Sequence, residues 1–271
     1  MKIIAVANQK GGVGKTTITR ELSACCALRG YQVLAIDCDP QGTLTSTWFP
    51  EIESDWPLLS HVLVEPDRAS GDATMLPLGD AFISSPVTNL DIVASNIRLS
   101  RAELQPDYST HRLAQQIKQW CKQYDLVFID SPPQLGKLSL AALFSADYVL
   151  VPCHPDVAGL SGLADLDFTI KRVKETVNPE LERLGAVINE FKAKTNLSAD
   201  SRRAIQDAEE KIGKLFDTNI HDYTKIAEAP YYKLPVVEYA PNHKAADQFW
   251  ALTEEFLDRL KLPRNRIAAV K

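Results

Sequence analysis

The fold of this chain is decided by the stretch Asn8-Gln9-Lys10-Gly11-Gly12-Val13-Gly14-Lys15-Thr16-Thr17. This stretch follows an apolar run at residues 3–7, which is typical of a short buried strand, and it leads into a helical pattern. A strand, a glycine-rich loop and Lys-Thr at the start of a helix together form a phosphate-binding P-loop. A glycine turn with no ligand would not require Lys-Thr at this place. We therefore predict a phosphate site here.

The residues of this loop have distinct physical tasks. The glycines let the backbone take conformations that a Cβ atom would forbid, so that successive N–H groups can point at phosphate oxygens. Lys15 is expected to reach the β- and γ-phosphates, and Thr16 is expected to offer its hydroxyl to Mg²⁺. A helix beginning near Thr17 adds the positive end of its dipole. The predicted nucleotide contacts are Gly11, Gly12, Val13, Gly14, Lys15, Thr16 and Thr17.

Two further segments deliver carboxylates to one edge of the predicted sheet. Residues 31–36 form a strand pattern that ends at Asp37-Cys38-Asp39-Pro40, and residues 126–129 form another that ends at Asp130. In open α/β sheets, ligands bind beyond the carboxyl ends of the strands. An aspartate that ends such an apolar run has the form of a Walker B residue, which holds Mg²⁺ through water. The sequence therefore predicts a magnesium site beside the phosphate loop.

Lys10 distinguishes this loop from an ordinary P-loop. A second lysine beside the first glycine resembles the deviant Walker A loop of the ParA/MinD superfamily, and the Asp-x-Asp-Pro-Gln stretch at residues 37–41 resembles its switch I. The resemblance implies that ATP and Mg²⁺ bind and that Lys10 crosses a dimer interface to touch the partner's phosphates. It also implies that Asp39 orients the attacking water and that Asp37 belongs to the magnesium shell, although the two roles could be exchanged. Residues 132–136 resemble switch II in the same way.

The rest of the chain alternates strand patterns with helical patterns. Further strands are expected at residues 148–152, 185–189 and roughly 214–220, and a last amphipathic helix at residues 245–260. Such alternation implies right-handed crossovers and a doubly wound, mostly parallel sheet with helices on both faces. We expect a single P-loop ATPase domain over residues 1–271, with a variable surface excursion at 48–90 and a basic C-terminal tail at 259–271.

Asn189 ends one of these strands. It matches the position whose side-chain amide reads adenine in the superfamily that the chain resembles. An asparagine at the end of a strand is also common as turn chemistry, and this alternative stays open.

The composition indicates a cytoplasmic protein. The five cysteines show no C-x-x-C spacing, which favours reduced thiols and no structural zinc. We find no signal segment and no apolar run near the roughly 20 residues that span a bilayer. The net charge is −5, but the first 170 residues hold 12 Lys+Arg against 19 Asp+Glu, whereas residues 171–271 hold 18 against 16. The basic charge is therefore concentrated in the C-terminal part.

Within the superfamily, the chain resembles the small ParA-type partition ATPases. The resemblance implies an ATP-dependent homodimer with slow intrinsic turnover that binds non-specific duplex DNA on the nucleoid. A ParB-like protein or cargo adaptor would stimulate hydrolysis and release the dimer, so that a plasmid, chromosome or protein cargo is positioned. A chain of negative net charge needs a local basic patch to hold DNA. The candidate DNA-binding residues are Lys192, Lys194, Arg202, Arg203 and Lys225.

Two alternatives remain at this point. The first is a MinD-like positioning ATPase that associates with membranes, although residues 263–271 lack the bulky apolar anchors of such a membrane helix. The second is a metabolic P-loop enzyme of the dethiobiotin synthetase type, which would turn over a small substrate without a protein partner.

Overall fold

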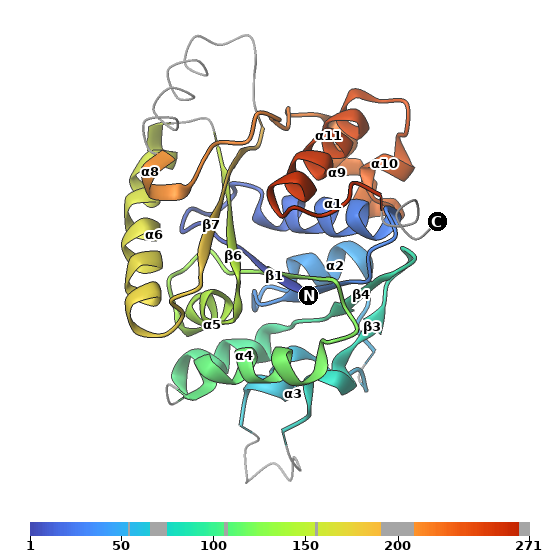
Figure 1. Cartoon of the computed structure of the whole chain (residues 1–271). Coiled ribbons are helices and arrows are strands. Elements are labelled where there is room, and N and C mark those ends of the chain that lie inside the picture. The colour runs from blue at the N-terminus through green and yellow to red at the C-terminus, as the bar shows by residue number, and fades with distance from the viewer. Residues whose placement is uncertain (54, 66–74, 106–107, 155–156, 191–208, 266–271) are drawn as a thin grey trace.

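The computed structural model describes the chain except for residue 54 and residues 66–74, 106–107, 155–156, 191–208 and 266–271 (Figure 1). Within the described residues, the strands form one seven-stranded sheet in the order β3-β4-β2-β5-β1-β6-β7. Only β3 runs antiparallel to its neighbour, so the predicted doubly wound, mostly parallel sheet is confirmed. The strands are β1 (Lys2–Val6), β2 (Val33–Asp37), β3 (Ile83–Ser84), β4 (Leu90–Val93), β5 (Leu126–Asp130), β6 (Tyr148–Cys153) and β7 (Glu182–Ile188).

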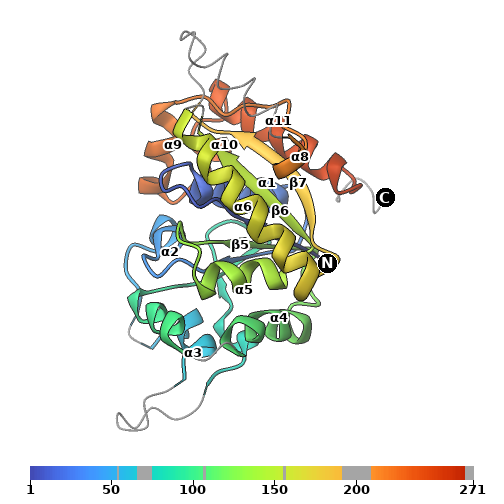
Figure 2. The same cartoon turned by 90° about the vertical axis from the view of Figure 1, so that its left-hand side faces the viewer.

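Helices cover both faces of the sheet (Figures 1 and 2). One face carries α3 (Leu59–Leu63), η1 (Leu78–Ala81), η2 (Ile97–Leu104), α4 (Tyr108–Trp120), α5 (Lys137–Ser145), α6 (Val157–Thr176) and α8 (Glu209–Ile212). The other carries α1 (Lys15–Leu28), α2 (Thr43–Trp48), α9 (Thr224–Glu228), η3 (Ala229–Tyr232), α10 (Val236–Tyr239) and α11 (Lys244–Arg259). The η elements are 3₁₀ helices.

The central strands are mostly apolar because both of their faces are buried. Along β1, Ile3 and Ala5 pack into the core on the α5 face, while Ile4 and Val6 pack into the core on the α1 face. This alternation follows from the two-residue period of a strand, and it explains why parallel strands read as continuous apolar runs. On α11, the residues predicted to dock at helical spacing are buried on the α1 face: Phe249, Leu252, Phe256 and Leu260, which follows the end of the helix.

Two elements differ from the sequence expectation. The helix α1 begins at Lys15 and not near Thr17, because Gly14 takes the left-handed N-cap conformation (φ 87°) directly before it. Residues 214–220 form no named strand, although Leu215 makes an isolated parallel bridge to Ala186 of β7. The guanidinium of Arg259 binds the carbonyl oxygens of residues 214 and 215 at 2.7 and 2.8 Å. The carbonyl oxygen of residue 214 also accepts from the backbone N–H of Ala186 at 3.3 Å, so Arg259 binds this segment at the point where it meets β7.

The described part of residues 48–90 is more than a surface excursion. Trp48, Leu59, Val62 and Leu78 are almost completely buried, the first on the α1 face of the sheet and the others on the α5 face. The segment therefore contributes to both cores. The predicted basic tail also needs correction at its start, since Arg259 is the last residue of α11.

Among the residues that the structure describes, no helix combines the length and the apolar character needed to cross a membrane.

Candidate nucleotide site

The loop between β1 and α1 has a shape that only glycine permits at two positions. Gly12 and Gly14 have φ angles of 74° and 87°, in the left-handed region. A Cβ atom at Gly14 would lie 2.1 Å from the side-chain nitrogen of Asn189, which is far inside van der Waals contact. Gly14 is therefore required both by its backbone conformation and by the approach of β7.

Two buried asparagines hold this loop against the sheet. The Nδ2 atom of Asn8 donates to the carbonyl of Pro152 in β6 at 2.7 Å, and its Oδ1 atom accepts from the backbone N–H of Lys10 at 3.0 Å. The Nδ2 atom of Asn189 donates to the carbonyl of Val13 at 3.3 Å. Asn189 thus lies against the P-loop. Recognition of the adenine base by its side-chain amide stays a prediction. Asn8 was missed by sequence reasoning, which did not consider what anchors the loop.

The start of α1 is linked to the end of β5 by two hydroxyl groups. Thr16 donates from Oγ1 to Asp130 at 2.7 Å, and Thr19 donates to the other carboxylate oxygen at 3.2 Å. The sequence predicted Thr16 and Asp130 as one site. Thr19 was missed, although its position three residues after Thr16 places it on the same helix face.

Lys15 is a buried cation at the centre of this site. Its ammonium donates to the carbonyl of Lys10 at 3.1 Å across the loop. Burial lowers the pKa of Lys15, and the charges of Asp130 and Asp39 oppose that shift. Lys15 is therefore held between carboxylates at the mouth of the loop, where an anionic ligand would stabilise its charged form.

Asp37 and Asp130 lie side by side in the sheet. The parallel register of β2 and β5 pairs them directly. The carboxylate of Asp37 accepts from the backbone N–H and the hydroxyl of Thr45 at 2.8 and 2.7 Å, and from the N–H of Asp39 at 3.1 Å. Burial raises the pKa of Asp37 to about 6. Burial, together with the charge of Asp37, raises the pKa of Asp130 to about 8.

Two adjacent carboxylates and a hydroxyl form an oxygen-rich donor set that suits Mg²⁺. A divalent cation would favour the charged form of both aspartates, which burial alone disfavours. The residues present therefore fit the metal that the sequence predicted at Thr16, Asp37 and Asp130.

Asp39 lies in a different environment from Asp37. Its side chain is partly exposed, and it accepts from the N–H of Gln41 at 2.9 Å within the loop before α2. Asp37 is fully buried. Of the two roles that the sequence left open, contact with a water molecule thus suits Asp39 better, because its carboxylate is the one that solvent can reach.

The sequence relatives of this chain share nearly its whole length. A family model described as an AAA domain matches residues 1–183. The sporulation initiation inhibitor protein Soj of Bacillus subtilis is 33% identical over 258 residues, which cover 94% of this chain and 97% of Soj. The chain belongs to the ParA/MinD superfamily. The chromosome partitioning protein ParA of Myxococcus xanthus is 30% identical over 272 residues, covering 98% of this chain and 92% of that protein.

Solved structures agree with this placement. A McdA variant from Cyanothece, in complex with ATP, superposes with a TM-score of 0.83 at 23% identity and covers 97% of each chain, which shows the fold. Cobyrinic acid a,c-diamide synthase from Mycobacterium smegmatis, with bound ADP and magnesium, has a TM-score of 0.79 at 26% identity and covers 96% of each chain. The similarity in fold therefore extends over 96–97% of the chain.

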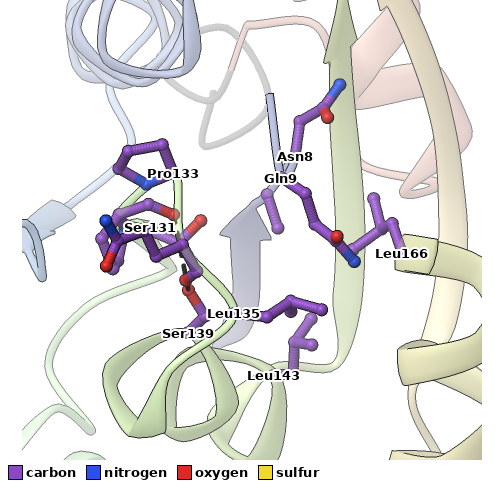
Figure 3. A pocket seen from close by; sticks show the side chains of 11 residues that line it. Asn8, Gln9, Ser131, Pro133, Leu135, Ser139, Leu143 and Leu166 are labelled. Atoms are coloured by element: carbon purple, nitrogen blue, oxygen red, sulfur yellow. Dashed lines mark hydrogen bonds between the residues drawn. The ribbon is translucent and has the colours of Figure 1, made fainter. Parts of the chain in front are cut away.

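Switch II of this ParA/MinD-superfamily chain lies directly beside the P-loop. In Figure 3, the side chain of Gln9 points toward Leu166 of α6, in a pocket that is also lined by Pro133 and Leu135 of switch II. The amide nitrogen of Gln9 is buried there without a hydrogen-bond partner among the described residues. The pocket therefore joins the start of the P-loop, switch II and α6.

Glu103 anchors the end of switch II. Its carboxylate accepts from the backbone N–H groups of Lys137 and Leu138, the first two residues of α5, at 2.6 and 3.1 Å. A Cβ atom at Gly136 would lie 2.4 Å from that carboxylate. A negative charge at the N-terminus of α5 is favoured by the helix dipole. The residue before α5 must therefore be small.

A buried ion pair connects the P-loop helix to the C-terminal part of the superfamily fold. Arg20 and Glu21 of α1 bind each other, with the guanidinium also donating to the carbonyl of Leu234 at 2.7 Å. Glu21 accepts from the N–H of Val236 at 2.7 Å, and Arg20 lies 4.2 Å from the ring of Trp48 in α2. Neither residue was singled out from the sequence, because their partners lie more than 200 residues away in the chain.

Of the five candidate DNA-binding residues, Lys225 lies in the described part of the chain. Lys192, Lys194, Arg202 and Arg203 lie outside the described residues. Lys225 is on α9, where its ammonium is 2.7 Å from Glu228 and 5.4 Å from the ring centre of Tyr239. Its charge is therefore already partly compensated within the chain.

Proposed function

We propose that this chain is an Mg²⁺-dependent ATPase that closes into a homodimer on ATP, holds non-specific duplex DNA, and is released when a partner protein stimulates hydrolysis. The observation that carries the proposal is the cluster of Lys15, Thr16, Asp37 and Asp130 at one end of the P-loop. It is supported by similar proteins named for chromosome partitioning and by similar structures that hold ATP, or ADP with magnesium.

The site residues divide the work of hydrolysis among themselves. Mg²⁺, when bound, would neutralise phosphate charge beside Thr16, Asp37 and Asp130. Lys15 compensates negative charge on the transferred phosphoryl group, and Asp39 holds the attacking water in line. Asp130 must lose its proton before its carboxylate can serve the metal, because burial raises its pKa above neutral.

Dimerisation is proposed to complete the site. Lys10 follows the buried Asn8 anchor, which accepts a hydrogen bond from its backbone N–H. In the proposed dimer, its ammonium reaches the nucleotide of the other subunit. Slow turnover then follows in the isolated chain, since a partner protein must bring the closed dimer into its hydrolytic geometry.

We propose that the ATP-bound dimer attaches to DNA and not to a membrane surface. A membrane-binding amphipathic helix needs an apolar face that is free to enter lipid. The apolar face of α11 is buried against the sheet through Phe249, Leu252 and Phe256, so this helix is occupied by core packing. We place the DNA contact among Lys192, Lys194, Arg202 and Arg203, with a smaller share for Lys225 because of its ion pair.

The experiment that tests this function measures binding to a random-sequence DNA duplex with ATP, with ADP and without nucleotide, over a salt series. We expect binding only with ATP, with an affinity that falls steeply as salt rises because phosphate contacts release counterions. Anionic phospholipid vesicles under the same conditions should show no ATP-dependent binding. Vesicle binding without DNA binding would replace this proposal by the MinD-like one.

Two variants separate the steps. Asp39→Ala should keep ATP bound without hydrolysing it, so that the dimer and the DNA complex persist. Lys10→Ala should bind ATP but fail to dimerise, as measured by sizing chromatography with light scattering. Hydrolysis at the wild-type rate by Asp39→Ala, or an intact ATP dimer of Lys10→Ala, would contradict the assigned roles.

The similarity to cobyrinic acid a,c-diamide synthase favours one second candidate, a metabolic ATP-dependent enzyme. Such an enzyme would hydrolyse ATP in step with a small substrate and would show no ATP-dependent DNA binding. The same salt series therefore decides between the two functions.

A further inference from the structure

An open cleft of about 450 Å³ lies between switch I and the turn that follows β4. The cleft is lined by Pro40 of switch I, by Phe49 and Pro50 directly after α2, and by Ile52 and Ile97. Its size is within the range of natural ligand pockets, which also are mostly apolar with a few polar groups. None of these residues belongs to the cluster that we assign to phosphate and magnesium.

The cleft contains a buried hydroxyl group with no partner. Ser95 is fully buried, lines the cleft, and its Oγ atom has no hydrogen-bond partner among the described residues. Buried polar groups in native structures are nearly always hydrogen-bonded, and an exception calls for an explanation. A ligand group that reaches into the cleft would supply the missing partner.

The same residue is connected to the magnesium cluster by hydrogen bonds. The backbone N–H of Ser95 donates to the hydroxyl of Thr45 at 2.9 Å, and that hydroxyl donates to the carboxylate of Asp37 at 2.7 Å. A Cβ atom at Gly42 would lie only 3.1 Å from the carbonyl oxygen of Ser95, so switch I and this turn also touch through their backbones. A change at the cleft is therefore two hydrogen bonds away from Asp37.

We propose that this cleft binds a short, uncharged peptide segment with an aliphatic side chain, supplied by the protein that stimulates hydrolysis. This identification of the contact rests on the proposed function, which requires such a partner. The aliphatic side chain packs between the apolar walls, and a peptide group of the same segment pairs with the hydroxyl of Ser95.

The chemistry of the lining selects this occupant. All the described residues that line the cleft are uncharged, so a charged ligand would lose hydration without gaining an ion pair from them. Gln41, Ser46 and Asn96 add amide and hydroxyl groups, which match the N–H and C=O groups of a peptide. An aromatic side chain such as Phe49 is a typical wall of grooves that bind extended peptides.

Occupation of the cleft would act on switch I. Pro40, which lines the cleft, directly follows the water-orienting candidate Asp39, and Gln41 and Gly42 come next in the sequence and line the cleft too. A bound segment would hold this loop against Ser95 and reduce its freedom, which favours one geometry of Asp39 over others. The partner would thereby stimulate hydrolysis without contributing a side chain to the phosphate site.

The test is a titration of the full chain with N-acetylleucinamide, which carries one aliphatic side chain between two peptide groups. Isoleucine δ1-methyl groups are labelled for NMR, since Ile52 and Ile97 line the cleft while Ile3 and Ile117 lie in the distant core. We expect saturable shifts at Ile52 and Ile97, with a millimolar Kd, and unchanged signals for the two core isoleucines. Non-saturating or uniform shifts would overturn the proposal.

Two controls define the specificity of the cleft. The matched charged probe, the α-amide of N-acetylglutamate, should bind at least fivefold more weakly. Ile97→Lys places a charge in the cleft at a side chain that is 64% exposed, and it should weaken N-acetylleucinamide binding at least fivefold while leaving the fold intact. Equal binding of the two probes, or unchanged binding to the variant, would contradict the assigned ligand class.

A second readout tests the coupling to hydrolysis. With saturating N-acetylleucinamide, the ATPase rate should rise at least twofold in the wild type and stay unchanged in Ile97→Lys, which should keep the basal rate. A saturable shift with no change in rate would overturn the coupling through switch I. Because the titration needs neither ATP nor DNA, its result is independent of whether the partition function itself is correct.

Discussion

The P-loop edge and the C-terminal end of the molecule both pair cations with carboxylates, but in opposite environments. At the P-loop edge, Lys15 is buried near Asp130, and burial lowers its pKa. At the C-terminal end, Arg264 is exposed and binds Asp258 at 2.6 Å and Glu254 at 3.1 Å. The buried charges of the P-loop edge are poorly solvated, so a charged ligand that pairs with them is favoured. The exposed charge of Arg264 is already compensated by the two carboxylates and solvated by water.

This difference shows why a basic residue count is a poor guide to ligand binding. The C-terminal part has an excess of lysine and arginine, yet Arg259 is stacked 3.6 Å above the ring of Phe216 and binds three carbonyl groups. Such cations hold the protein together. The following predictions test how far the two environments differ.

The largest effect is expected at the buried lysine. Lys15→Ala should weaken ATP binding by at least about 100-fold, because the loop loses the only cation that we assign to the nucleotide of its own subunit. Isothermal titration calorimetry with ATP and Mg²⁺ measures this directly. Arg264→Ala is the matched control and should bind ATP like the wild type. If Lys15→Ala and Arg264→Ala bound ATP with similar affinity, the buried lysine would not be a ligand-binding cation.

A smaller effect is expected for the stability of the C-terminal end. Arg259→Ala should lower the free energy of unfolding by about 3 kcal/mol, because it removes the stack on Phe216 and leaves carbonyl groups without their donor. Urea denaturation followed by circular dichroism measures the loss. Arg264→Ala should leave the midpoint unchanged, since an exposed ion pair contributes little. An unchanged free energy of unfolding in Arg259→Ala would mean that the guanidinium does not stabilise the fold and is available to bind a ligand.

The third prediction concerns pH and the carboxylates of the P-loop edge. The pKa of Asp130 is raised to about 8, well above its unfolded value. Its protonation therefore stabilises the fold at low pH, and this contribution is lost as pH rises from about 4 through about 8. Without Mg²⁺, the free energy of unfolding of the wild type should fall by about 2 kcal/mol between pH 6 and pH 8, relative to that of Asp130→Asn.

Thermal unfolding of both proteins over this pH range provides the measurement. At pH 8, Mg²⁺ with ATP should raise the thermal stability of the wild type but not that of Asp130→Asn, since the variant lacks the carboxylate. A pH profile that is identical for the two proteins would show that Asp130 is charged in the folded state throughout.

The smallest effect is expected at Lys225. Lys225→Ala should weaken ATP-dependent DNA binding less than twofold, because Glu228 already compensates the ammonium. A double substitution of Lys192 and Lys194 by alanine should weaken it at least tenfold and should reduce the salt dependence. Fluorescence anisotropy with a labelled duplex measures both. A large loss in Lys225→Ala would show that its ion pair opens when DNA binds.

Much of the site could be predicted from the sequence because its parts are coded by short stretches. The Gly12 and Gly14 conformations, the hydroxyl of Thr16 and the carboxylate of Asp130 each follow from a motif of a few residues at the end of a strand. Thr19, Thr45 and Asn8 were not assigned from such a motif, and their roles became visible only through their hydrogen bonds to groups on other elements.

The sequence by itself determined the phosphate loop, the doubly wound sheet and the superfamily, because strand periods and glycine conformations are local properties of the chain. Only the tertiary structure decided which charges remain available for ligands. It buried Lys15 near two aspartates, stacked Arg259 on Phe216, and left the hydroxyl of Ser95 beside switch I without a hydrogen-bond partner among the described residues. These outcomes depend on distances between residues far apart in sequence, which are set by how the helices pack on the sheet.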